Sequence, residues 1–252
     1  ANVTALTENS ATSALTVSGA LAVNSGGTTL TNNNSSGSAL LTVSGGVSGT
    51  GNLALHNNSL IANGITFSGA GNINHIGTIT NAGTGSGATL ISKIIDTNVA
   101  GVVQNSTTSQ LTLSGANTYT GLTTVSAGNL TLSGGAAIAN TGAVNLSTAG
   151  AALTLAASET IGSLAGVTGT NVNLGATTLT TGGDNRTTAY AGVIGGTGGL
   201  TKAGSGTFTL SGANTYTGLT TISGGTLRYG ITNALAAGAV TVNDSGTYDL
   251  NG

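Results

Sequence analysis

Two identical twelve-residue segments limit the folds open to this chain more than any other feature does. Residues 113–124 read Leu-Ser-Gly-Ala-Asn-Thr-Tyr-Thr-Gly-Leu-Thr-Thr, and residues 210–221 repeat them after an offset of 97 positions. A weaker marker, an apolar residue followed by Ser-Gly, recurs at Val17, Val43 and Phe67, so successive markers lie 26 and 24 positions apart. A unit of about 24 residues divides the longer offset into roughly four. Periods of this length are typical of solenoid proteins, in which each repeat packs on its neighbours.

The residues around the first copy suggest what one unit contains. Residues 111–113 and 130–132 both read Leu-Thr-Leu, and residues 122–125 form a further short segment that ends in Val. Alternation of apolar and polar residues is typical of half-buried strands. We interpret 114–121 as a turn-rich link and 126–128 as a corner. Three strands and three corners between positions 111 and 135 would make one coil.

We therefore predict an all-β fold, a three-sided parallel β-helix of roughly 10–12 coils of about 24 residues, with residues 1–252 as a single segment. Thr-rich strands stack well on copies of themselves, and the absence of Pro leaves every backbone N–H free for the ladder between coils. The alternative is disorder, because 44 of the 252 residues are Gly. Leu, Val, Ile and Ala recur throughout, however, whereas disordered chains are poor in apolar residues.

Composition excludes several function classes. Only 4% of the residues are charged and the net charge is −2, so a nucleic-acid binder, which needs clustered Lys and Arg, is excluded. No apolar run reaches the roughly 18 residues that a transmembrane helix needs. The chain has no Cys, so it has neither disulfides nor thiol chemistry.

The repeated pattern, with a preceding Thr and a following Gly-containing corner, resembles the autotransporter-associated β-strand repeat, also called the passenger-associated transport repeat. The two matches lie at about 112–132 and 209–229. The segment 198–206 before the second copy is similar to the lead-in of the family, with a Lys at its centre. The segment 107–110 before the first copy departs from the family pattern.

This resemblance implies a passenger of type V secretion, built as a right-handed β-helix and exported through an outer-membrane barrel translocator. The expected location is the surface or the surroundings of a Gram-negative cell. We expect the chain to be an interior slice of a longer passenger.

The corner residues of the repeat are the candidate site residues, and we predict a structural role for them. They are Asn117, Tyr119 and Gly121 in the first copy and Asn214, Tyr216 and Gly218 in the second. The alternative for the two tyrosines is sugar binding, because exposed aromatic rings can stack on sugars.

No catalytic, cofactor-binding or metal-binding residue is predicted, and no cofactor is expected. The acids are Glu8, Asp96, Glu159, Asp184, Asp244 and Asp249, and we interpret them as solvated corner residues. A paired-carboxylate site needs two acids a few ångströms apart, and the only tight mixed group is Asp184-Asn185-Arg186. His56 and His75 are separated by less than one predicted coil, without Cys or a carboxylate beside them, so we interpret them as isolated surface or corner residues.

We predict a non-enzymatic structural and adhesive stalk segment that displays or forms an extracellular rod. Its partners would be a host or neighbouring-cell surface or a glycan. The alternative is a section of a fibre that self-associates end to end or laterally. Two further alternatives have less support: a polysaccharide-active β-helix enzyme, and an ice-binding protein, for which Thr-x-Thr pairs such as 78–80 would have to recur in register once per coil.

Overall fold

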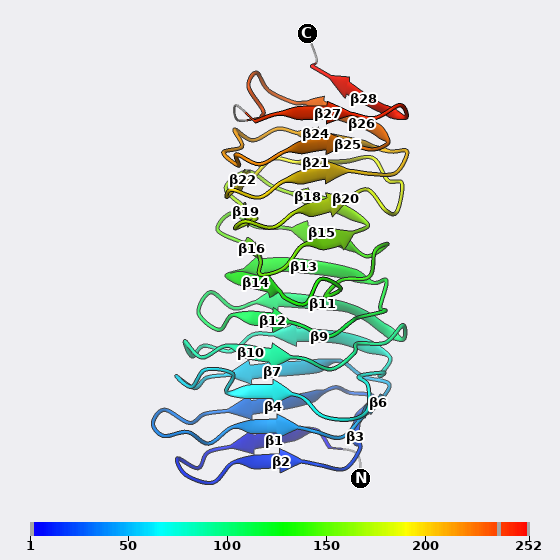
Figure 1. Cartoon of the computed structure of the whole chain (residues 1–252). Coiled ribbons are helices and arrows are strands. Elements are labelled where there is room, and N and C mark those ends of the chain that lie inside the picture. Colours follow the sequence, from blue (N-terminus) through cyan, green and yellow to red (C-terminus); the bar gives the residue numbers. More distant parts are fainter. Residues whose placement is uncertain (1–2, 236–237, 251–252) are drawn as a thin grey trace.

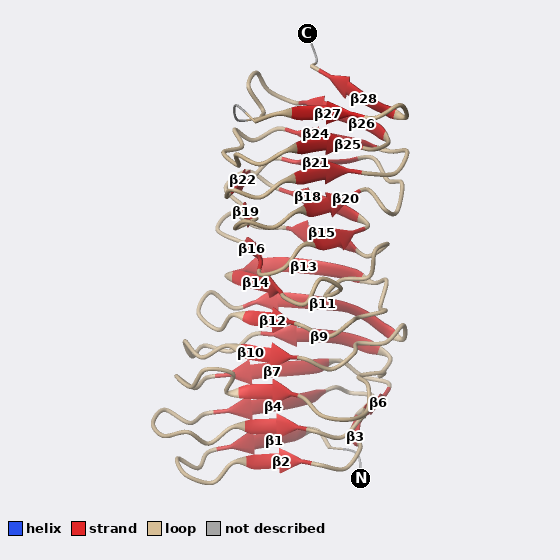
Figure 2. Ribbon diagram, viewed as in Figure 1, coloured by secondary structure: helices blue, strands red, loops and turns tan. Residues whose placement is uncertain are grey.

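The computed structural model describes residues 3–235 and 238–250, which form a single rod of stacked coils (Figure 1). Within these residues every regular element is a strand and none is a helix (Figure 2). All strand pairs are parallel, and neighbours in each sheet come from successive coils. The predicted all-β parallel solenoid is confirmed.

Each coil has three sides, which we call the first, second and third side. The first side is a twelve-stranded sheet of β1 (Ala5–Glu8), β4 (Thr28–Asn32), β7 (Leu53–Asn57), β9 (Gly77–Asn81), β11 (Val99–Asn105), β13 (Leu122–Ala127), β15 (Ala143–Leu146), β18 (Ser163–Gly166), β21 (Thr188–Tyr190), β24 (Thr207–Leu210), β26 (Gly225–Tyr229) and β28 (Gly246–Asp249). The second side is a nine-stranded sheet of β2 (Leu15–Val17), β5 (Leu41–Val43), β8 (Ile65–Phe67), β10 (Thr89–Ile91), β12 (Leu111–Leu113), β14 (Asn129–Leu132), β16 (Ala152–Leu155), β19 (Asn171–Asn173) and β22 (Val193–Gly195).

The third side is less regular. It begins with the pair β3 (Leu21–Val23) and β6 (Val47–Gly49) and continues through single bridges at Ile73 and Ile95. It ends in a five-stranded sheet of β17 (Glu159–Ile161), β20 (Leu179–Thr181), β23 (Leu200–Lys202), β25 (Thr220–Ile222) and β27 (Val240–Val242). In Figure 1 the nearer strands run from left to right as the chain rises from its N-terminus, so the coil is right-handed.

The solenoid has about 11 turns of about 22 residues, and the length of a coil varies. On the first side, Leu53 of β7 pairs with Ile79 of β9, whereas Thr207 of β24 pairs with Thr226 of β26, so the second of these coils is much the shorter. The predicted unit at 111–135 needs a correction. Leu111 pairs with Leu130, so β12 and β14 are the same side of consecutive coils. The segment 114–121, interpreted as a link, is the third side of its coil.

The core follows from the alternation of side chains along each short strand. On the second side Leu111, Leu130 and Leu153 stack in register and are fully buried, whereas the threonines after them point outward and are half-buried. Each fully buried aliphatic side chain contributes about 1.5–3 kcal/mol relative to an exposed one. Because every coil adds a layer to the same columns, the apolar core runs along the rod.

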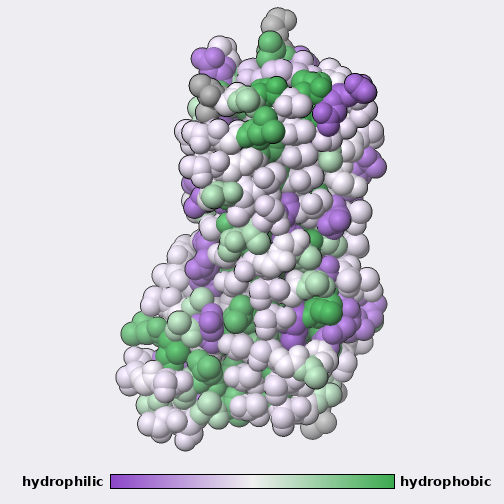
Figure 3. Space-filling view, in the orientation of Figure 1, coloured by the Kyte–Doolittle hydropathy of each residue, from purple (hydrophilic) through white to green (hydrophobic). Residues whose placement is uncertain are grey.

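Buried amides fill the wide corners between the first and second sides in the N-terminal half. The side-chain nitrogens of Asn32, Asn57 and Asn81 donate to backbone carbonyls at distances of 2.6, 2.7 and 2.7 Å. Gln104 continues the set and accepts a further bond from Asn81. At Gly128 the same corner shrinks to one residue between β13 and β14. The rod is therefore broader near its N-terminal end, as Figure 3 shows, and pale, weakly polar residues cover most of the face in that view.

Candidate functional site: the two repeat corners

In the first copy of the repeat, Asn117 bonds to the coils on both sides of its own. Its Oδ1 accepts from the backbone N–H of Ile95 at 2.8 Å, and its Nδ2 donates to the carbonyl of Ala137 at 2.7 Å. The side chain is almost fully buried, so these bonds form where water does not compete. One amide thus connects three successive coils on the third side.

The second copy repeats this arrangement. Asn214 accepts from the N–H of Ile194 at 2.8 Å and donates to the carbonyl of Ala234 at 2.6 Å. The same residue type therefore forms the same pair of bonds with different neighbours. This recurrence explains why the repeat needs Asn here: a single side chain must both donate and accept.

The repeat tyrosines lie in the core rather than at the surface. Tyr119 is fully buried and Tyr216 nearly so, and each hydroxyl pairs with the hydroxyl of a Thr in the strand that follows, Thr123 at 2.8 Å and Thr220 at 2.7 Å. Burial raises the pKa of Tyr216 to about 12. Neither ring is accessible for stacking on a sugar.

The repeat glycines lie where two coils approach most closely. A Cβ added at Gly121 would lie 2.0 Å from the carbonyl oxygen of Ala100, and one added at Gly218 would lie 2.2 Å from that of Gly198. Such contacts are far below van der Waals distance, so any side chain would push the coils apart. The structure thus places Asn, Tyr and Gly of each copy together on one side of a coil, and we keep the name repeat corner for this segment.

The two copies occupy different sides of the solenoid. The first follows the second-side strand β12, whereas the second follows the first-side strand β24. Accordingly, the backbone N–H of Thr118 donates to the carbonyl of Ile95 on the third side, and that of Thr215 donates to the carbonyl of Ile194 on the second side. The offset between the copies therefore spans four coils plus two further sides, not the roughly four whole coils predicted from the sequence.

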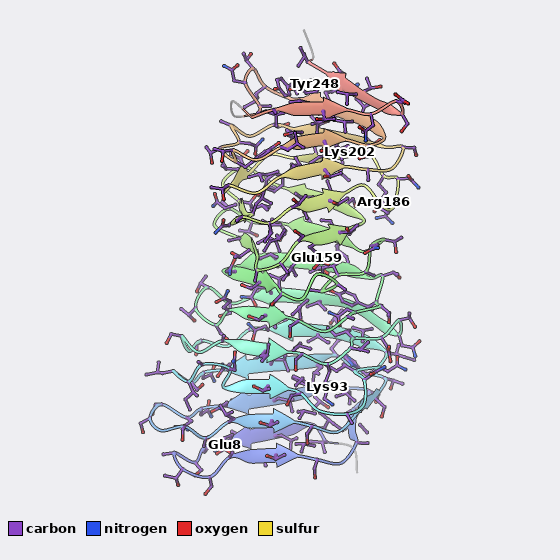
Figure 4. The ribbon with its side chains drawn as sticks, in the orientation of Figure 1. Glu8, Lys93, Glu159, Arg186, Lys202 and Tyr248 are labelled. Atoms are coloured by element: carbon purple, nitrogen blue, oxygen red, sulfur yellow. The ribbon has the colours of Figure 1, made fainter. Side chains whose placement is uncertain are left out.

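Both lysines of the chain are buried, which the sequence analysis missed. Lys93 Nζ donates to the carbonyls of Ser44, Ala70 and Gly71 at 2.9, 2.5 and 3.0 Å. Lys202 Nζ donates to those of Ala203, Gly204 and Gly224 at 2.6, 2.9 and 3.2 Å. Burial lowers the pKa of both ammonium groups. Both residues are labelled in Figure 4. Each stands two positions after an inward apolar residue, and this alternation is the signal that could have revealed them.

Two of the six acids depart from the predicted solvated corners. Glu8 is buried, and Glu159 is buried at the start of β17, where its carboxylate accepts the N–H groups of Ala137 and Ile138, both at 3.1 Å. Burial raises the pKa of Glu159, and these two bonds oppose that shift. Asp184 contacts Ser163 at 2.7 Å and the exposed Arg186 at 3.6 Å.

The two histidines also differ. His56 is half-buried, whereas His75 is fully buried, with its Nδ1 lacking a partner. His75 therefore lies in a corner, between the bridge at Ile73 and the start of β9, but it is buried rather than at the surface. Within the ranges that the structure describes, no group of three or more His, Cys, Asp or Glu side chains is arranged to hold a metal ion.

Outward threonines stack in register on two sides of the rod. These are single threonines rather than Thr-x-Thr pairs, and the variation in coil length hides their regular spacing in the sequence. The rank on the second side is interrupted once, by Leu90, which lies between Thr66 and Thr112. Its threonines are Thr16, Thr42, Thr66, Thr112, Thr131 and Thr154. The rank on the third side consists of Thr160, Thr180, Thr201, Thr221 and Thr241.

Comparison with known proteins agrees with this geometry. A family model described as passenger-associated-transport-repeat matches residues 108–132 and 200–228, which contain the two corners. The chain contains autotransporter passenger repeats. An alignment over 133 residues, which covers 50% of this chain, is 42% identical to the adhesin BmaC autotransporter of Brucella suis biovar 1 (strain 1330). The segment spans 4% of the length of that relative. No solved structure matches it.

The repeats also give the location of the passenger segment. An autotransporter passenger is an extracellular or cell-surface protein of a Gram-negative bacterium, which confirms the predicted location. In the part of the chain that the structure describes, no helix is long and apolar enough to cross a bilayer.

Proposed function

We propose that this passenger segment is a rigid, non-enzymatic section of an adhesive stalk. The observation that supports this proposal most is the unbroken parallel pairing of the first side from β1 to β28. A rod whose coils share one core resists bending, and it can therefore carry a binding surface away from the cell. The similarity to an adhesin autotransporter supports the same role.

Display on a heterologous translocator tests this proposal. Cells that display the segment are compared, for adhesion to epithelial cells, with cells that display the translocator alone. A second pair carries a known binding domain at the tip, with and without the segment beneath it. An adhesive stalk increases adhesion by itself, and a spacer increases the reach of the tip domain. If neither adhesion nor reach changes, the proposal fails.

A second candidate is lateral self-association, because the outer surfaces that the threonine ranks form carry no charge. Low charge removes the repulsion that keeps rods apart in solution. Sedimentation velocity over a concentration series, with electron microscopy, measures this association. An ice-binding surface also requires regular ranks of threonine. An ice-recrystallisation assay on the same sample distinguishes ice binding from self-association. A monomer at all concentrations with no effect on ice contradicts both.

A further inference from the structure

The corner at residues 182–187, between β20 and β21, is the longest one that joins a third-side strand to a first-side strand in the described chain. The corresponding corners of the neighbouring coils are shorter, with Gly162 alone in the preceding coil and residues 203–206 in the following one. Described coils lie on both sides of this corner, so its exposure results from its own length. Figure 4 shows Arg186 at the outer edge of the rod.

Arg186 is the basic side chain of the rod that is most open to solvent. The chain has four Lys and Arg residues in total. Lys93 and Lys202 are 3% and 1% exposed, and carbonyl groups hold their ammonium groups. Arg228 lies within β26, which pairs with a strand on each side, and its side chain bonds to a carboxylate. The side chain of Arg186, by contrast, is 71% exposed.

The backbone at Arg186 is held by side chains rather than by the ladder between coils. The N–H of Arg186 donates to Asp184 Oδ1 at 3.2 Å, and the N–H of Thr207 donates to the hydroxyl of Thr187 at 3.2 Å. Among the described residues, neither Arg186 nor Thr187 forms a backbone–backbone hydrogen bond. The strand that follows, β21, pairs with β18 at a single position. This segment can therefore open locally, as proteolysis of a folded chain requires.

We propose that the Arg186–Thr187 peptide bond is a processing site for a protease of trypsin-like specificity. Such a protease binds a basic side chain in an acidic pocket and cleaves the bond that follows it. Water is the co-reactant. Its oxygen adds to the carbonyl carbon of Arg186, the bond to the nitrogen of Thr187 breaks, and the products are a carboxylate and an amine. One cleavage therefore adds one water to the total mass.

The cleaved rod should stay in one piece, because parallel pairing and the core both cross the cut. Strands β22 and β23 lie after the cut and pair with β19 and β20, which lie before it. In the core, Leu200 stacks on Leu179 and Ile194 stacks on Val172, and all four side chains are buried. Cleavage thus changes one chain into a two-part rod without releasing either part.

Limited trypsin digestion of the folded 252-residue chain tests the site. The expected first products are fragments 1–186 and 187–252, whose masses add up to the intact chain plus one water. In native size-exclusion chromatography they should elute together at the position of the intact rod, and in urea they should separate. We expect cleavage at Arg186 to be at least ~100-fold faster than at Lys93 or Lys202, which become accessible only when coils open.

Matched variants identify the bond. Arg186→Gln should remain intact under conditions that cleave all of the wild type, whereas Arg228→Gln should be cleaved at the wild-type rate. Circular dichroism checks that both variants fold. The proposal is wrong if the first cut lies at another residue, or if Arg186→Gln is cleaved as fast as the wild type. It is also wrong if the folded wild type resists trypsin that digests the urea-unfolded chain, or if the two fragments separate without denaturant.

Discussion

At the scale of single residues, the interior of this solenoid contains more polar chemistry than its low charge suggests. Ammonium, carboxylate and amide groups are all buried, and backbone groups of neighbouring coils satisfy them. Lys93 and Lys202 have only carbonyl partners. A carbonyl left without its donor in the interior is costly, so each lysine connects coils rather than merely filling space.

Removal of a buried lysine should destabilise the rod. Lys202→Met keeps most of the volume of the side chain but leaves three carbonyls without their ammonium donor, and we expect a loss of about 1–3 kcal/mol. Urea unfolding measures the difference. Arg186→Met, at an exposed corner, is the control and should change stability by less than about 0.5 kcal/mol. Equal effects for the two variants would contradict the structural role of Lys202.

His75 should make the folded state sensitive to mild acid. Burial lowers the pKa of His75, so the folded chain favours the neutral ring. The unfolded chain binds the proton near its ordinary pKa of about 6.5, so stability is full above that pH and declines as the pH falls toward the folded-state pKa. Urea unfolding between about pH 7.5 and about pH 5 should show this decline. His75→Phe should reduce this decline, and an unchanged decline in that variant would contradict the role of His75.

At the scale of elements, the sides of the coil differ in what they tolerate. The corners between the first and second sides vary in length from one coil to the next, so they are free to change. The repeat corner is different, because Asn117 and Tyr119 must both point inward at fixed positions. A change of length there moves both residues out of register.

A two-residue insertion distinguishes these corners. Between Leu60 and Ile61, in an exposed corner, we expect little loss of stability because longer surface loops are cheap. Between Thr118 and Tyr119 we expect a loss of about 3 kcal/mol or more, since an aromatic side chain leaves the core. Denaturant midpoints compare the two variants. If both insertions prove neutral, Tyr119 does not anchor the corner.

The strands around the first repeat were predictable, and the corner between them was not. Leu-Thr-Leu at 111–113 and 130–132 has the local alternation that marks a strand, and both predictions are confirmed. The segment 114–121 is typical of a turn in composition. It becomes a side of the coil only because Asn117 bonds to Ile95 in the preceding coil and to Ala137 in the following one. The buried lysines were missed for a similar reason: their carbonyl partners lie mostly in other coils.

At the scale of the whole molecule, the fold is a tapering rod with one continuous core. Eleven steps along the first side at about 4.8 Å give a length of ~50 Å. The taper results from wide corners, filled by buried amides, that give way to short ones at Gly128. Backbone pairing sets the length and the corners set the width, so neither dimension depends on surface charge.

Small-angle X-ray scattering of the isolated chain should therefore give the profile of a short rod. We expect a maximum dimension of ~50–60 Å that stays constant over a range of salt concentrations. Of the two ion pairs between described residues, only Arg228–Asp249 joins neighbouring coils, and the backbone ladder between β26 and β28 already connects these coils. A maximum dimension that grows with protein concentration would instead indicate association of rods.

The different sides occupied by the two identical repeats have an immunological consequence. The outward residues of one copy, Ala116, Thr118 and Thr120, recur as Ala213, Thr215 and Thr217, but they face another direction and lie ~22 Å further along the axis. An antibody raised against one copy would find a second, identical epitope on the same rod. Each rod could therefore be bound from two flanks by antibodies of the same specificity. Such antibodies would connect rods on neighbouring cells, so cells densely covered with these rods would agglutinate.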